Sequence, residues 1–94
     1  MLPEKIKIGW KTYEIQNKES VLVDNSACYG SIDYDGLVIS LRQANTKKQN
    51  EATLLHEILH GIENMNNLDL GEHTITVLAD AFYTVLCDNE LNFN

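Results

Sequence analysis

Two histidines four residues apart, with a glutamate directly after the first, are the part of this sequence best suited to chemistry. The segment reads His56-Glu57-Ile58-Leu59-His60, which is the HExxH pattern. On a helix, side chains four residues apart share one face at roughly 6 Å between Cβ atoms, so both imidazoles can bind one metal ion. Glu57 would lie at the edge of that face, where it can take a proton from a water molecule activated by the metal. This set of groups is typical of zinc-dependent hydrolysis of peptide bonds, with Glu57 as the catalytic base and then acid.

The surroundings of the motif favour a helix that is buried over much of its circumference. Apolar residues recur at helical spacing around the motif: Leu54, Leu55, Ile58, Leu59 and Ile62. Histidines among such neighbours are expected in a cleft, not on an open surface. The chain has three histidines, and two of them fall in the motif. We therefore favour metal ligation by His56 and His60 over a chance match to the pattern.

A third protein ligand is needed, because catalytic zinc usually takes three protein ligands and a water molecule. The position six residues after His60 is Asn66, so the histidine extension of the metzincin type is absent. Glu72, expected at the start of a second helix, is the preferred third ligand, since a chain that reverses after the first helix could bring it beside His60. Three alternatives stay open at this point: His73, Asp80 and Asp69.

A peptidase of this kind also needs a donor that stabilises the negative charge on the carbonyl oxygen, and a surface that holds the substrate. The sequence offers four donors and does not choose among them: Tyr29, Tyr34, Tyr83 and His73. The strand expected at residues 37–41 could offer an edge with which an extended peptide pairs.

The first half of the chain, residues 1–45, alternates apolar and polar side chains with the period of two that is typical of strands. The expected elements are, in order, two short strands within residues 5–16 joined by a turn at 9–12, a segment at 20–24 that fits either a strand or a helical turn, and a hairpin of strands 29–34 and 37–41 with Asp35-Gly36 at its turn.

The second half of the chain, residues 46–94, changes to helical periodicity. Thr46 and Gln49 fit a capping box at the start of the motif helix. The helices are expected to run from about Lys47 to a point between Gly61 and Met65, and from about Gly71 to Asn89. Strands followed by helices indicate one α+β domain over residues 1–94, in which a small, mostly antiparallel sheet packs on the HExxH helix and a second, C-terminal helix.

Composition narrows the classes of function further. The 94 residues include 14 acidic and 7 basic side chains, for a net charge of −7, which argues against binding to nucleic acid. No stretch approaches the ~20 apolar residues of a membrane span, and the first residues lack the apolar core of a signal peptide. We expect a cytoplasmic protein that acts on a peptide or protein substrate; the sequence leaves its oligomeric state open.

Three segments together resemble a known group of proteins: residues 29–33, residues 37–41 and the run Thr53-Leu54-Leu55-His56-Glu57-Ile58-Leu59-His60-Gly61. They are similar to the small phage and prophage HExxH proteins related to the ImmA/IrrE-like and SprT-like zinc metallopeptidases. The resemblance covers most of the chain, from about Ile6 to Asn89. It implies one Zn²⁺ per chain, two histidine ligands, an acidic third ligand and a bacterial or phage source.

Two functions follow as expectations. The first is hydrolysis of peptide bonds by a zinc metallopeptidase, with the metal held by His56, His60 and Glu72. The second is a non-catalytic, zinc-stabilised binding or regulatory protein of phage origin, in which a fourth protein ligand such as His73 closes the site.

Overall fold

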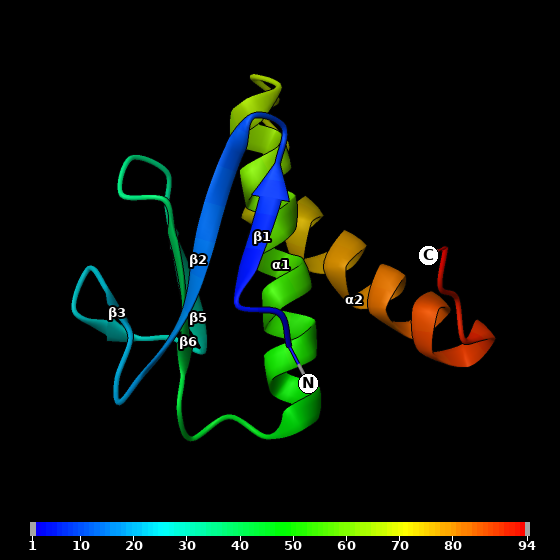
Figure 1. Ribbon diagram of the computed structural model, residues 1–94, viewed down its shortest axis with the longest axis horizontal. Helices are drawn as coiled ribbons and strands as arrows, with labels where there is room; N and C mark the ends of the chain where they lie inside the picture. The colour runs from blue at the N-terminus through cyan, green and yellow to red at the C-terminus, as the bar shows by residue number, and fades with distance from the viewer. Residues whose placement is uncertain (1, 94) are drawn as a thin grey trace.

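The alternating first half of the chain forms a four-stranded sheet and a separate two-stranded hairpin in the computed structural model, which describes residues 2–93 (Figure 1). The strands of the sheet are β1 (Lys5–Ile8), β2 (Lys11–Lys18), β5 (Gly30–Asp33) and β6 (Val38–Arg42), and those of the hairpin are β3 (Leu22–Val23) and β4 (Ser26–Ala27). The segment at 20–24, which the sequence left undecided, is therefore partly extended.

The sheet has the strand order β1-β2-β6-β5. The outer pairs β1–β2 and β5–β6 are antiparallel, whereas the central pair β2–β6 is parallel, with Ile15 opposite Ile39. Because β6 lies between β2 and β5, both of its edges are already paired. The expectation that residues 37–41 offer a free edge to a peptide is therefore wrong, and the edge strand on this side of the sheet is β5.

The turn between β5 and β6 forms where Asp35-Gly36 predicted it. The Asp33 side chain accepts hydrogen bonds from the backbone N–H groups of Asp35 (3.1 Å) and Gly36 (2.9 Å), which closes an Asx turn. Leu37 then adopts a left-handed backbone, with φ of 59°, so β6 begins at Val38, one residue later than expected.

The two helices have the bounds that the sequence indicates. Helix α1 spans Lys47–Met65, and the hydroxyl oxygen of its N-cap, Thr46, accepts a hydrogen bond from the Gln49 N–H at 3.2 Å. Helix α2 spans Glu72–Asn89 and ends at Glu90, which has a left-handed backbone. Within the described residues, neither helix has both the length and the apolar composition that a membrane span requires.

Helix α1 lies between the sheet on one side and α2 on the other (Figure 1). The main core fills the space between the sheet and α1 and consists of Ile8, Tyr13, Ile39, Leu41 and Leu54. Helix α2 packs against α1 and fully buries only two apolar side chains, Ile75 and Ala79. The arrangement confirms the expected α+β class and places the HExxH helix at the centre of the molecule.

Candidate metal centre

Three side chains converge at the point where α1 faces the start of α2. The Nε2 atoms of His56 and His60 each lie 2.8 Å from an oxygen of the Glu72 carboxylate. The two Nε2 atoms are 3.2 Å from each other. Ligands at the ~2.0–2.1 Å bond lengths of a tetrahedral zinc site lie roughly 3.3 Å apart, so these atoms need only small adjustments to hold a metal. Among the described residues, these three form a group able to bind a metal ion.

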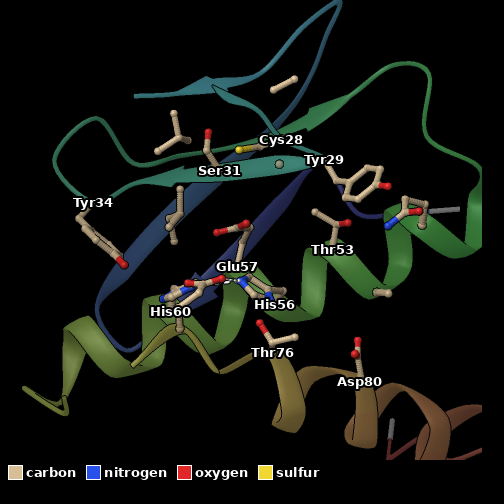
Figure 2. A pocket seen from close by; sticks show the side chains of 17 residues that line it. Cys28, Tyr29, Ser31, Tyr34, Thr53, His56, Glu57, His60, Thr76 and Asp80 are labelled. Atoms are coloured by element: carbon tan, nitrogen blue, oxygen red, sulfur yellow. Dashed lines mark hydrogen bonds and ion pairs between the residues drawn. The ribbon is translucent and has the colours of Figure 1, made fainter. Parts of the chain in front are cut away.

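The helical repeat and one chain reversal explain the convergence. His56 and His60 are separated by one turn of α1 and lie side by side on the face of the cleft in Figure 2. Glu72 is the first residue of α2, and the loop after Met65 brings it back beside His60. The histidine side chains are only 22% and 17% exposed, whereas that of Glu72 is 69% exposed. The site is therefore backed by protein on the histidine side and open on the carboxylate side.

The other residues considered as third ligands lie outside this group in the described part of the chain. Neither His73 nor Asp69 belongs to the group of possible ligands in the described part of the chain, and both are exposed. Asp80 lines the same cleft two turns further along α2, but it lies outside the group (Figure 2). The arrangement favours Glu72 among the alternatives that the sequence left open.

The three residues face a cleft of about 740 Å³. One wall consists of β5 and the residues on either side of it, α1 forms the floor, and the first half of α2 forms the other wall (Figure 2). Gly30 of β5 allows the sheet to approach α1 closely, since a Cβ atom there would lie 2.6 Å from Cγ2 of Thr53. A side chain at this position would push the strand away from the helix and widen the cleft.

Glu57 lies in the same cleft and is almost completely buried, with 6% of its surface exposed. In the described structure its carboxyl group receives no hydrogen bond. Its pKa is raised from 4.5 to about 7, mainly because burial disfavours the charged form; the charge of His60 opposes this shift and that of Glu72 adds to it. A carboxyl group with a pKa near neutrality can both accept and return a proton, as a general base and acid must.

The raised pKa of Glu57 predicts how the free energy of unfolding depends on pH. Because the folded, metal-free chain binds this proton more tightly than the unfolded chain, stability is lost as the pH rises from about 4.5 to about 7. Glu57→Gln removes this titration. We expect the variant to be more stable than the wild type at pH 8 by up to about 3 kcal/mol, at roughly 1.4 kcal/mol per pH unit, and the gap to close by pH 4.

Urea unfolding of the metal-free proteins, with a chelator present, measures this difference at each pH. A stability difference that stays constant from pH 4 to pH 8 would contradict the prediction.

Glu63 is a residue of the site that the sequence reasoning missed. One of its carboxylate oxygens lies 3.2 Å from His60 Nδ1, on the side of the ring opposite Glu72. The other oxygen accepts hydrogen bonds from the N–H groups of Leu70 (2.7 Å) and Gly71 (3.4 Å). The Leu70 N–H holds the pKa of the Glu63 carboxyl below its usual range, and His60 and the Gly71 N–H add to this effect. The signal in the sequence was its spacing of three residues from His60, which places both on one helix face.

Of the four side chains that the sequence offered as hydrogen-bond donors, two line the cleft, Tyr29 and Tyr34. Tyr34 follows β5 and lines the cleft, and in Figure 2 its hydroxyl is directed toward His60 and Glu57. Burial raises the pKa of Tyr34, and the charges of Glu63 and Glu57 add to the shift. Tyr29 lines the far end of the cleft. The Tyr83 hydroxyl donates to Glu51 at 2.7 Å, and neither Tyr83 nor His73 lines the cleft.

Comparisons with protein families, with characterised proteins and with solved structures found no match to this chain. The assignment of a function therefore depends on the geometry of the site.

Proposed function

We propose that this chain is a zinc-dependent peptidase that cuts extended peptides. One observation carries the proposal: His56, His60 and Glu72 converge on one point, and the buried carboxyl group of Glu57 lies in the same cleft without a hydrogen bond in the described structure. The resemblance of the sequence to small phage and prophage HExxH peptidases supports the same conclusion.

The ligand set favours zinc over magnesium or calcium. Two imidazole nitrogens and one carboxylate oxygen are typical of catalytic zinc, whereas magnesium and calcium prefer oxygen ligands alone. No fourth histidine, cysteine or acidic side chain joins the group among residues 2–93. This open position favours the enzyme over a closed structural site, since a catalytic centre leaves room for water and substrate.

Bound zinc would supply a water molecule of lowered pKa and a positive charge near the substrate carbonyl. Glu57 is placed to accept one proton from an attacking water molecule as the water oxygen bonds to the carbonyl carbon. The same carboxyl group then gives the proton to the amide nitrogen as the C–N bond breaks, so that one carboxyl and one amine product leave. Tyr34 lies on the β5 side of the cleft, where its hydroxyl can donate a hydrogen bond to the carbonyl oxygen.

Strand β5 provides the surface for the substrate. The Arg42 N–H donates to the carbonyl oxygen of Tyr29, so alternate residues of this strand direct their backbone groups toward β6. The backbone N–H and C=O groups of Gly30 and Ile32 consequently face away from the sheet, and both residues line the cleft. An extended peptide that pairs with this edge would pass in front of the histidines.

The test is peptide cleavage by the zinc-loaded chain. The purified protein is given zinc, the excess is removed, and its metal content is measured beside its action on a mixture of unstructured peptides by mass spectrometry. We expect about one zinc per chain and defined cleavage products, both lost in the His56→Ala/His60→Ala variant and in chelator-treated protein. One bound zinc without any cleavage would instead indicate a zinc-stabilised binding protein, and no bound zinc would refute both functions.

A further inference from the structure

Glu63 connects the two parts of the chain that must meet to form the metal site. It belongs to α1, three residues after His60, and its carboxylate reaches both His60 and the loop that leads into α2. Its side chain is only 15% exposed. Since Glu72 is the first residue of α2, whatever fixes this loop also fixes the third ligand.

The contact with His60 favours one of the two positions of the proton on the imidazole ring. Glu63 Oε1 lies 3.2 Å from Nδ1 of His60 and can accept a hydrogen bond from an Nδ1–H group. A proton on Nδ1 leaves the lone pair on Nε2, which points toward His56 and Glu72. Carboxylates that hold a ligating histidine in this way raise its basicity and fix the orientation of its ring.

The second contact of Glu63 is with the residues that lead into α2. Gly71 is the N-cap of α2 and has no side chain with which to cap the helix. Glu63 Oε2 instead accepts hydrogen bonds from the N–H groups of Leu70 and Gly71, and its negative charge lies beside the positive end of the helix dipole. A carboxylate of α1 thus holds the two residues that lead directly into α2, and the next residue is the ligand Glu72.

We propose that Glu63 is a positioning residue that holds His60 and the start of α2 together, so that the three ligands are arranged before the metal binds. This inference rests on the proposed function, since the metal is the zinc of the proposed peptidase. It adds to the three ligands and Glu57 a residue that contacts a ligand and not the metal.

Glu63→Gln is a sharp test because glutamine has the same size but cannot make both contacts well. If its oxygen accepts from the Leu70 N–H, its amide group faces His60 and donates to Nδ1, which forces the proton onto the nitrogen that must bind the metal. If its oxygen faces His60 instead, its N–H groups face the N–H of Leu70. One of the two contacts is lost in either orientation.

The experiment measures zinc affinity by competition with a chromophoric chelator, and hydrogen exchange of the Leu70 amide in metal-free protein. We expect Glu63→Gln to bind zinc about 10–100-fold more weakly and its Leu70 amide to exchange at least about 10-fold faster. Asp69→Asn is the matched control, since it also removes one carboxylate charge, from a loop residue that lies outside the group of ligands in the described part of the chain, and it should behave as the wild type.

The two measurements distinguish failure of the proposed role of Glu63 from failure of the proposed zinc site. Zinc affinity within about twofold of the wild type would overturn the proposed role of Glu63, whatever the exchange rate. If the wild type binds no zinc, the proposed function fails, and the Leu70 amide then decides alone: faster exchange in Glu63→Gln supports the link between the helices, and unchanged exchange refutes it.

Discussion

Replacing Glu57 by glutamine is expected to leave zinc binding intact and to slow peptide hydrolysis by about 10²–10⁴-fold. Glutamine fills the same buried space, and the three ligand atoms are on other side chains. It cannot accept a proton from water at any accessible pH. The same change should stabilise the metal-free chain at neutral pH, so a loss of activity cannot be attributed to unfolding.

The pH dependence of the rate of peptide hydrolysis tests the same role of Glu57 independently. Only the deprotonated form of Glu57 can act as the base, so the wild-type rate should be lost as the pH falls through its pKa. That pKa is about 7 without metal, and the positive charge of a bound zinc should lower it. In Glu57→Gln this part of the pH profile should disappear.

Glu51→Gln is the matched control for the Glu57 variant. Glu51 is another glutamate of α1, but it contacts Tyr83 and lies outside the cleft. The test compares initial rates of cleavage and zinc content among the wild type, Glu57→Gln and Glu51→Gln. A Glu57→Gln protein that contains zinc and retains more than a tenth of the wild-type rate would exclude Glu57 as the base.

The parts of the fold that could be predicted from the sequence are those encoded by neighbouring residues. The Thr46 cap is a contact between residues three apart, and it set the start of α1 correctly. The two histidines were predictable for the same reason, because one helical turn fixes their relation once the helix is known. Glu72 was identified as a carboxylate at the expected start of the second helix, which is also a local feature.

The parts that could not be predicted depend on pairing between distant segments. The sheet has a parallel pair at its centre, β2–β6, whose partners are separated by more than 20 residues. Alternation of apolar and polar side chains shows that each segment is a strand, but it does not give its neighbour or its direction. The peptide-binding edge was therefore assigned to residues 37–41, whereas the edge strand of the cleft is β5.

Glu63 illustrates the same limit within the site. Its spacing from His60 was visible, but its second contact, with Leu70 and Gly71, depends on the path of the loop between the helices. Helix periodicity assigns Glu63 to one face of α1, but it does not predict that the loop between the two helices contacts this residue. Glu57 and Glu63 differ in their surroundings: the Glu57 carboxyl group is buried and receives no hydrogen bond among the described residues, whereas Glu63 contacts both His60 and the loop.

Tyr34→Phe is expected to lower kcat by about 10²–10³-fold, with little change in KM or in zinc content. The tyrosine hydroxyl is directed toward His60 and Glu57 from the opposite side of the cleft (Figure 2). In the proposed reaction, negative charge would develop on the substrate carbonyl oxygen in this part of the cleft. Its raised pKa keeps the hydroxyl protonated, and able to donate, through the neutral range. The charge forms only during the reaction, so its stabilisation should affect kcat more than KM.

The substitution removes the hydroxyl without releasing the turn on which it lies. The backbone carbonyl of Tyr34 accepts a hydrogen bond from Lys11 Nζ at 3.1 Å, and phenylalanine keeps this carbonyl. Tyr83→Phe removes the same group from a tyrosine outside the cleft, where loss of the bond to Glu51 should affect stability by about 1 kcal/mol and leave kcat unchanged. Steady-state kinetics on both variants separate the roles, because a Tyr34→Phe enzyme with unchanged kcat, or with a defect in KM alone, would show that this hydroxyl does not contact the transition state.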